Sequence, residues 1–571
     1  MTEHELEQLA GEQAIEDLLF LDKRMSSRAW RLNHLYWIEG ETPEGTREVM
    51  RFRMNWAQKA FYKSLWWLCC ILKVRQLGFS TFIAIFMLDD VLFNLNHKGG
   101  IVDKTDVDAM KKLAKIKFAY DNLNRTDKDN WDLVGIGDAV KAVRPLVAPT
   151  NEHTITFGGP AKGAIWCGTN FRGDTAQVLH ISELGYTAHY FPRKATELMA
   201  GATNAVHKGN HIFVESTFEG GKVGEYYDLI TTSMTNNGVP FEKLTPMDYK
   251  FYFFCWWKHP EYMLAGADIP PLEEWEAEYY DKLKTDHGII LTKAQIAWHI
   301  RKWRQQRDAM MKEFPSVPED CLNASTSDAI YGRELISMKK DGRLQKVNID
   351  KRYGIFACWD LGFTDFMAIW IGQVVGNQIR WLRYYENTRE TISTYVNWIK
   401  QQEDELGVKI NQHYLPHDAA QHSRSGRSFT DDLSEQGISN FIVVPVTPDV
   451  WVGINAVRDL FPNFWFDPVT EYYWKKDGKN YLGGLASLES YCQNEDTAAG
   501  VIRPVPIKNQ ATHGADAIRT FAEAYTRGLV SFDISGPPRT NLNTKPRVKG
   551  CPSLPAKGKR HRYTPKPQVR R

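Results

Sequence analysis

Short apolar runs alternate with helical patterns over most of this 571-residue chain, and that alternation limits the folds it can adopt. Between about residues 50 and 245 the runs are 66–72, 99–102, 164–167, 177–181 and 211–214. Short continuous apolar runs are typical of strands that are buried on both faces of a sheet. Strands of this kind, separated by helices, predict βα units around a mostly parallel sheet.

A second α/β segment runs from near Tyr353 to about Leu529, and its first apolar runs (354–362, 367–372 and 378–385) predict a β-meander. Before it, Pro315 and Pro318 end a helical stretch and mark a domain seam. We therefore expect an N-terminal helical segment over 1–48, an α/β core over 49–245, a subdomain and linker over 246–330, a second α/β domain over 331–530 and a basic tail over 531–571. The composition of the tail is typical of disordered segments.

Charge is distributed unevenly along the chain, although its net value is only +2. Residues 534–571 carry eleven Lys or Arg and no acid, which leaves 60 basic and 69 acidic residues, a balance of −9, in the rest. Any contact to a nucleic acid would therefore have to come from local basic grooves or from the tail. No apolar run reaches the roughly 18 residues of a membrane span, and the polar N-terminus argues against a secretory signal.

Residues 73–81, KVRQLGFST, follow an apolar run and lead into another apolar stretch that has a helical pattern. A strand, a glycine-containing loop and a helix in this order cradle phosphates with backbone N–H groups. The usual pattern has a lysine directly after the second glycine, and here Phe79 takes that place. Lys73 or Arg75 is expected to supply the charge, and Ser80 to bind the magnesium of ATP. An ordinary strand-to-helix turn is the alternative.

Two later strands end in residues suited to ATP hydrolysis. Residues 177–183, QVLHISE, end in Glu183, where a nucleotide hydrolase keeps the carboxylate that polarises the attacking water. Residues 211–217, HIFVEST, end in hydroxyls suited to sensing the γ-phosphate. Gln58 is a candidate for reading adenine, with a solvated helix position as its alternative. Arg172 is a candidate arginine finger, with a structural ion pair as its alternative.

Three aspartates lie beside or at the end of apolar segments in the second half: Asp360, Asp418 and Asp516. Two-metal cleavage of a phosphodiester needs several converging carboxylates, and oxygen ligands favour Mg²⁺ or Mn²⁺. Strand, strand and helix each delivering an acid is the arrangement of RNase H-like nucleases, with Asp516 expected at the start of its helix. Asp365, His417 and His513 are secondary candidates, as further ligands, as proton carriers or as groups that hydrogen-bond the ligands.

These motifs, in this order, resemble the large terminase subunit of tailed double-stranded DNA bacteriophages, over roughly residues 50–530. In that family the phosphate loop is often of the Arg-Gln-x-Gly type, and some members have the lysine at its start and an aromatic residue after the glycine. The matching positions are Lys73, Arg75, Gln76, Gly78, Phe79, Ser80, Thr81, Arg172, Gly173, Ser216, Thr217 and 314–319. The resemblance assigns Gln58 to the same ATP site, Ser216 and Thr217 to coupling, and Asp360, Asp418 and Asp516 to the nuclease metals.

The chain departs from the family at Ser182, since the residue before the catalytic glutamate is usually an aspartate that holds magnesium through water. The resemblance implies an α/β fold with an N-terminal P-loop ATPase of the additional-strand class, whose sheet is mostly parallel, and a C-terminal RNase H-like nuclease domain. By resemblance, ATP hydrolysis moves double-stranded DNA into a procapsid through the portal, and a nuclease with two Mg²⁺ ions, replaceable by Mn²⁺, cuts concatemeric DNA.

The partners implied by the resemblance are the portal protein, a small terminase subunit and further copies in a pentameric ring. The implied place of action is the host cytoplasm, docked on the procapsid and absent from the mature virion, with no membrane involved. Two alternatives stay open: a nuclease whose ATPase domain has decayed, which Phe79 and Ser182 allow, and a cellular helicase-nuclease.

Overall fold

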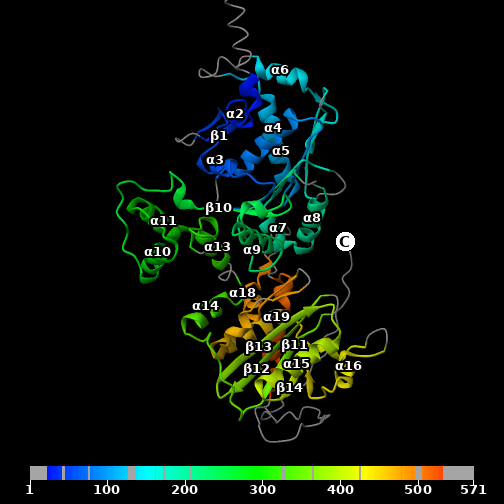
Figure 1. The fold of residues 1–571 in the computed structure, drawn as a ribbon. Coiled ribbons are helices and arrows are strands. Elements are labelled where there is room, and N and C mark those ends of the chain that lie inside the picture. The colour runs from blue at the N-terminus through cyan, green and yellow to red at the C-terminus, as the bar shows by residue number, and fades with distance from the viewer. Residues whose placement is uncertain are drawn as a thin grey trace, which may run out of the picture.

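The computed structural model describes residues 22–530, apart from the gaps 42–45, 75–76, 127–134, 161, 171–174, 206–208, 308, 325–328, 363–364, 423–425, 473, 477–478 and 495–504. Two α/β domains lie one above the other, and a small helical subdomain lies beside the first domain (Figure 1). Within the described ranges, no helix combines the length and the apolarity needed to cross a bilayer.

The segment before the first sheet is not helical throughout, which corrects the expectation for residues 1–48. Helix α2 (Arg28–His34) is followed by an antiparallel hairpin of β1 (Trp37–Glu41) and β2 (Arg47–Arg51). The sequence between the two strands contains Pro43 and Gly45, both of which interrupt a helix and favour a turn.

The first domain is built on an eight-stranded sheet with the order β10-β3-β9-β8-β4-β7-β6-β5. The strands are β3 (Leu68–Lys73), β4 (Lys98–Val102), β5 (Leu146–Val147), β6 (Thr154–Phe157), β7 (Gly163–Gly168), β8 (Val178–Ser182), β9 (His211–Ser216) and β10 (Tyr249–Phe254). Strands β10 to β7 in this order are parallel, and β6 and β5 continue the sheet in antiparallel fashion. Because β9 lies between β3 and β8, the predicted additional-strand class is confirmed. Strand β10 shares this sheet, so the core extends past the boundary expected at residue 245.

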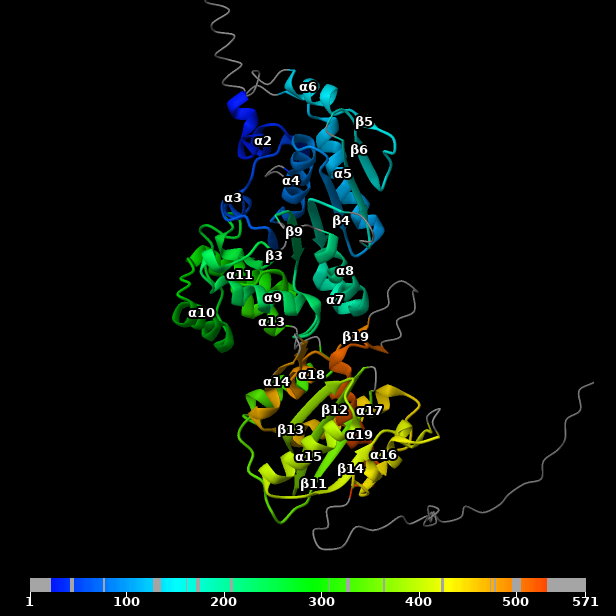
Figure 2. The same ribbon diagram turned by 45° about the vertical axis from the view of Figure 1, so that its right-hand side comes forward.

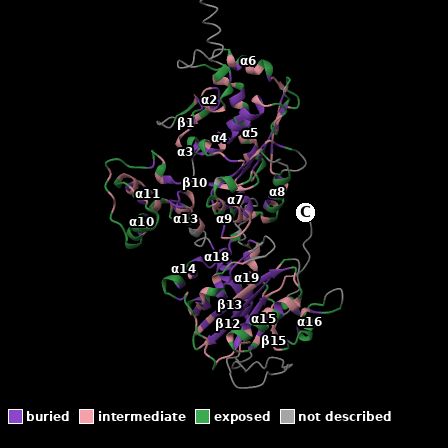
Figure 3. Cartoon of the chain, viewed as in Figure 1, coloured by how far each residue is buried: buried purple, intermediate pink, exposed green. Residues whose placement is uncertain are grey.

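Helices cover both faces of this sheet. Helices α4 (Phe79–Phe93) and α5 (Asp106–Asp121) pack on one face, and α7 (Leu184–Tyr190), α8 (Pro192–Ala205) and α9 (Glu225–Asn237) pack on the other. The alternating side chains of β3 divide between the two cores, with Ile71 in one and Leu72 in the other. Helix α4 is buried along almost its whole length (Figure 3), since α2 and α5 contact the sides that the sheet leaves open.

The subdomain beside the first sheet is held together by aromatic stacking. Its helices are α10 (Glu274–His287), α11 (Lys293–Gln306), α12 (Ala309–Glu313) and α13 (Pro318–Ala324). Trp256, which follows β10, stacks on Trp298 and His299 of α11, with ring centroids 5.4 and 4.5 Å away. The aromatic segment after residue 250 therefore packs inside the domain.

The second domain contains a six-stranded sheet with the order β15-β14-β11-β12-β13-β16. The strands are β11 (Ile355–Asp360), β12 (Phe366–Val375), β13 (Gln378–Thr388), β14 (Ile410–Leu415), β15 (Phe441–Val443) and β16 (Phe464–Phe466). Strands β11, β12 and β13 form the predicted antiparallel meander, while β14 and β15 run parallel to β11. This strand order is the RNase H-like one, so the fold class predicted for both domains is confirmed.

Helices on both faces enclose this second sheet (Figure 2). Helices α15 (Ile392–Leu406) and α16 (Phe429–Glu435) contribute to one core. The other core contains residues of α14 (Gly332–Lys340), α17 (Val450–Leu460), α18 (Gly484–Glu489) and α19 (Gln510–Thr526).

The two domains meet where the loop 217–223, which follows β9, reaches α18. Lys222 forms an ion pair with Glu489 at 3.7 Å, and Val223 packs against a small apolar cluster of the second domain. Gly221 lies so close to Ser490 that an added Cβ would be 2.2 Å from its hydroxyl oxygen. The end of a central strand of the first domain is thus connected to the second domain through a short loop.

Candidate functional site

Three neighbouring parallel strands, β3, β9 and β8, bring their carboxyl ends to one edge of the first sheet. Lys73 ends β3, Ser216 ends β9 and Glu183 directly follows β8. The Lys73 Nζ lies 3.3 Å from Glu183 Oε1, and Ser216 Oγ donates a hydrogen bond of 3.2 Å to Glu183 Oε2. Ligands of open α/β sheets bind at this edge, so three residues chosen from separate motifs meet where a nucleotide is expected.

Glu183 has a left-handed backbone conformation, with φ 54° and ψ 42°, and caps the first turn of α7. Such a conformation costs a non-glycine residue about 1–3 kcal/mol and is common at functional sites. Contacts around it hold the turn in place, because the Gly185 N–H donates to Ser216 Oγ at 3.1 Å. An added Cβ at Gly185 would lie 2.6 Å from the Thr217 carbonyl, so only glycine fits there.

Helix α4 begins directly after Gly78, the glycine of the predicted phosphate loop. Gly78 has φ 69°, a conformation that favours glycine, and it caps the N-terminus of α4. Gln58 braces this loop: its Nε2 donates to the Gly78 carbonyl at 2.9 Å, while its Oε1 accepts from the Asn55 N–H. The expected adenine contact of Gln58 stays a prediction. Arg75, Gln76 and Arg172 lie outside the described residues.

Two further residues of this edge were missed by the sequence reasoning. Glu215 of β9 is fully buried, and its Oε1 accepts hydrogen bonds from Ser80 Oγ at 2.7 Å and Ser182 Oγ at 3.0 Å. Its Oε2 forms an ion pair with Lys73, and His180 Nε2 lies 3.2 Å from Oε1. A single acid inside an apolar strand is the signal that could have revealed Glu215, because buried carboxylates need partners.

The charges of Lys73 and Glu215 stabilise each other. Burial raises the pKa of Glu215, but the Lys73 ammonium and the His180 hydrogen bond outweigh it and hold that pKa well below its usual range. Burial lowers the pKa of Lys73, while the Glu215 and Glu183 charges raise it to about 12. Burial also lowers the pKa of His180. The site therefore offers a lysine cation at the mouth of the loop.

Phe79 and Thr81 lie at the start of α4 but have different surroundings. Phe79 is only 1% exposed and packs against Phe61 and Phe254, with centroids 5.6 and 4.6 Å away. The Thr81 hydroxyl accepts a hydrogen bond of 3.3 Å from Lys115 of α5. The position at which the usual phosphate loop has its lysine therefore belongs to the core of this domain.

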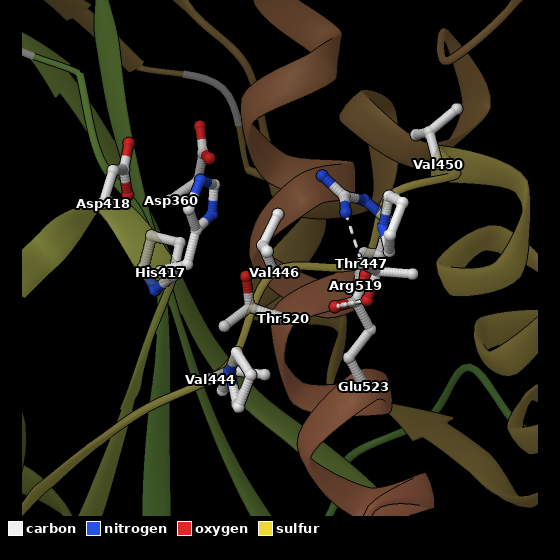
Figure 4. Close-up of a pocket in the computed structure, with 13 residues that line it drawn as sticks. Asp360, His417, Asp418, Val444, Val446, Thr447, Val450, Arg519, Thr520 and Glu523 are labelled. Atoms are coloured by element: carbon white, nitrogen blue, oxygen red, sulfur yellow. Dashed lines mark hydrogen bonds and ion pairs between the residues drawn. The ribbon is translucent and has the colours of Figure 1, made fainter.

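The second domain has its own group of acids at the end of β11. Asp360, the last residue of β11, and Asp418, in the turn after β14, line one pocket of about 270 Å³. Figure 4 shows these two carboxylates and His417 on one side of the pocket, and Thr447, Arg519 and Glu523 on the other. Asp360 and Asp418 thus line the same pocket, while their role as metal ligands stays a prediction.

The third predicted acid is held differently. Helix α19 begins at Gln510, so Asp516 lies inside the helix and not at its start, which corrects the expectation. A capping box of Asn509 and Thr512 sets that earlier start. The Asp516 carboxylate pairs with Arg519 Nε at 3.1 Å, and Arg519 also pairs with Glu523. Neither Arg519 nor Glu523 was singled out from the sequence.

His513 joins two of the acids. Its Nδ1 is 2.7 Å from Asp360 Oδ2, and its Nε2 is 3.3 Å from Asp365 Oδ1. Burial raises the pKa of Asp360 to about 6, with the Asp516 charge adding to the rise and the His513 hydrogen bond opposing it. Burial lowers the pKa of His513, but the Asp360 hydrogen bond and charge raise it to about 9.

The donor set of this pocket fits a hard divalent cation by its chemistry, since Asp360 and Asp418 offer carboxylate oxygens. Burial and the Asp516 charge raise the pKa of Asp360, and a bound cation would lower it. Across the ranges that the structure describes, no three His, Cys, Asp or Glu side chains are arranged to hold one ion. Asp516 is instead paired with Arg519.

Comparison with solved structures finds large terminases from several phages. The bacteriophage HK97 large terminase is 12% identical and matches over 87% of this chain and 100% of its own, with a TM-score of 0.42. The P22 large terminase nuclease domain is 15% identical over 33% of this chain and 89% of its own, with a TM-score of 0.26. The ATPase domain of the Thermus phage P74-26 large terminase is 10% identical over 46% of this chain and 94% of its own, with a TM-score of 0.30.

The structures that this chain is similar to are thus large terminases, the family that its motifs resemble. No protein-family profile matches the sequence, and no curated protein does.

Proposed function

We propose that this chain is the ATP-hydrolysing and DNA-cutting subunit of a viral genome-packaging motor. The observation that carries the proposal is the convergence of Lys73, Glu183 and Ser216 at one sheet edge, in the same chain as an RNase H-like sheet with paired acids. Either site alone fits many enzymes. Their combination fits a protein that both moves DNA and cuts it.

In the proposed ATPase reaction, the oxygen of a water bonds to the γ-phosphorus and the bond to the bridging oxygen of ADP breaks. Glu183 orients this water and accepts its proton, and the Ser216 hydroxyl keeps the carboxylate in position. Lys73 exchanges its carboxylate partners for phosphate oxygens, and the N–H groups at the start of α4 bind the same phosphates. Arg172 stabilises the developing charge from a neighbouring subunit.

In the proposed nuclease reaction, water attacks the phosphorus of the DNA backbone and a sugar oxygen leaves. Asp360 and Asp418 would hold Mg²⁺, with Asp516 as the third ligand and Asp365 as a further candidate. Bound magnesium, replaceable by Mn²⁺, would supply an activated water and a positive charge at the leaving oxygen. His513 fixes the orientation of Asp360 through its Nδ1.

As proposed partners the chain has double-stranded DNA, the portal protein and a small terminase subunit, and it works as one of five copies in a ring. The proposed place of action is the host cytoplasm, docked on the procapsid, with no part in the mature virion. ATP hydrolysis moves the DNA through the portal, and cutting of the concatemer starts and ends each round.

The ATPase half is tested by measuring ATP hydrolysis by the full chain with and without double-stranded DNA. We expect turnover by the parent and its loss in Glu183→Gln and Lys73→Ala, with nucleotide binding kept in Glu183→Gln. Turnover retained in Lys73→Ala would assign the phosphate contact to Arg75. A parent that stays inactive even with portal and DNA would favour a nuclease with a decayed ATPase domain.

The nuclease half is tested with circular plasmid DNA in the presence of Mg²⁺ or of a chelator. We expect metal-dependent nicking and linearisation by the parent, and loss of both in Asp360→Asn and Asp418→Asn. Asp404→Asn, an exposed acid on α15, serves as the matched control and should cut like the parent. Equal cutting by all three variants would refute the assigned site.

A further inference from the structure

The first domain has no acid at the position where P-loop ATPases usually have one. In such enzymes the magnesium of bound Mg·ATP is held by the loop Ser or Thr hydroxyl and by an aspartate near the end of a neighbouring strand. Here the loop hydroxyl is that of Ser80, and the position before Glu183 is Ser182. A serine brings no charge to the cation, so another carboxylate has to replace the missing one.

Glu215 occupies the position directly beside Ser182 on the adjacent strand. In the parallel pair of β8 and β9, Ser182 and Glu215 are register partners. The same oxygen, Glu215 Oε1, accepts hydrogen bonds from Ser182 Oγ at 3.0 Å and from Ser80 Oγ at 2.7 Å. The carboxylate is therefore bonded to the hydroxyl expected to bind magnesium and to the side chain that replaces the usual aspartate.

We infer that Glu215 supplies the carboxylate that holds the magnesium of Mg·ATP, in place of an acid at position 182. The longer glutamate side chain reaches from β9 to the place that a shorter aspartate would reach from β8. This inference rests on the proposed ATPase function and assigns one of its metal-binding groups. It also explains the presence of a fully buried acid directly after the apolar residues 212–214 of β9.

A purely structural role for Glu215 makes a different prediction. Its Oε2 forms an ion pair with Lys73, so a counter-ion role would make Glu215 important for binding nucleotide even without metal. A magnesium-binding role makes Glu215 important for the metal-dependent part of binding. The magnesium-binding role also predicts that a carboxylate placed at position 182 can restore the metal-dependent part of binding that is lost at position 215.

The experiment measures binding of a fluorescent ADP analogue to the full chain, in EDTA and in Mn²⁺, and bound Mn²⁺ by electron paramagnetic resonance. The variants are Glu215→Gln, Glu215→Asp and the double variant Ser182→Asp/Glu215→Gln. The matched control is Asp90→Asn, which removes a buried, ion-paired acid near the far end of α4. Circular dichroism and thermal melting establish that each variant is folded.

We expect Glu215→Gln to weaken Mn²⁺ binding in the ADP complex by about 10- to 100-fold while binding in EDTA stays close to that of the parent. Glu215→Asp keeps the negative charge beside Lys73, so it should weaken Mn²⁺ binding without changing nucleotide binding in EDTA. The double variant should recover most of the loss, and Asp90→Asn should match the parent.

Equal weakening with and without metal, or no recovery in the folded double variant, would overturn the inference and leave the ATPase proposal standing. Unchanged Mn²⁺ binding in Glu215→Gln would also overturn the inference without affecting the ATPase proposal. A parent that binds no nucleotide under either condition would overturn the ATPase proposal and this inference together.

Discussion

The imidazole of His513 lies between Asp360 and Asp365 and gives the second domain a pH-dependent ion pair. Burial lowers the pKa of His513, but the hydrogen bond and charge of Asp360 raise it to about 9, while the pKa of Asp360 is raised to about 6 by burial. Between these values, in the absence of metal, an imidazolium faces a carboxylate. The pair holds Asp360 in one orientation.

This pair predicts a pH-dependent stability. Because the folded-state pKa of His513 is above its usual 6.5, its contribution to the unfolding free energy is complete below pH 6.5 and is lost as the pH rises through about 9. Denaturant melts in EDTA should show the stability difference between the parent and His513→Gln shrinking from pH 6.5 to 9.5. His287→Gln, at the exposed end of α10, should show no such trend. A constant difference for His513→Gln would contradict the assigned pair.

The sequence predicted the placement of residues at or just after strand ends, such as Glu183, Asp360 and Asp418. Glu215 and Arg519 escaped prediction because their roles depend on partners from other elements. The position of Glu215 beside Ser182 follows from the register of β8 and β9, which the sequence alone does not reveal. Arg519 matters because it holds Asp516, one turn earlier on α19.

Helix α4 begins with Phe79, whose side chain packs in the core of the first domain. Phe79 lies between Phe61 and Phe254 and is 1% exposed, so the side chain that replaces the usual lysine stabilises the start of the helix. Gly78 caps this helix, and the nearby Lys73 ammonium at the end of β3 is ion-paired with Glu215.

The packing of Phe79 predicts that restoring the usual lysine does not rescue the site. Phe79→Lys buries an ammonium among aromatic rings, and Phe79→Ala leaves a cavity, which typically costs about 3–5 kcal/mol. Both variants should lose stability in urea melts, and Phe79→Lys should not restore turnover to Lys73→Ala. Phe191→Ala, which removes a half-exposed ring, is the matched control. Recovered turnover in the double variant would show that this position can reach the phosphates.

Element boundaries were predictable where apolar runs end at charged or glycine residues, as in β3, β8 and β11. They were not predictable where local hydrogen bonds compete with the apolar pattern. The capping box at Asn509 starts α19 before Asp516, and the hairpin of β1 and β2 interrupts the helical pattern expected near the N-terminus.

At the scale of the whole molecule, the loop 217–223 connects the first domain to α18 of the second. Figures 1 and 2 both show α18 at the end of the second domain that faces the first. The contact combines an ion pair from Lys222, apolar packing by Val223 and the close approach of Gly221 to Ser490. The whole connection lies within eight residues of Glu215.

This contact predicts the effect of a single methyl group. Gly221→Ala places a Cβ 2.2 Å from the Ser490 hydroxyl oxygen, so the loop must move away from α18. Amide hydrogen exchange in α18 should become faster in this variant. Gly168→Ala, whose added Cβ meets no atom within 4 Å, is the control and should leave the exchange unchanged. Identical exchange in Gly221→Ala and the parent would show that the loop does not hold α18.

The contact of the loop 217–223 with α18 could couple ligand binding in the two domains. If nucleotide at the first site changes the affinity of the second site for DNA by some factor, DNA must change the affinity for nucleotide by the same factor. Binding of DNA to the second domain would then change the affinity of the first domain for nucleotide.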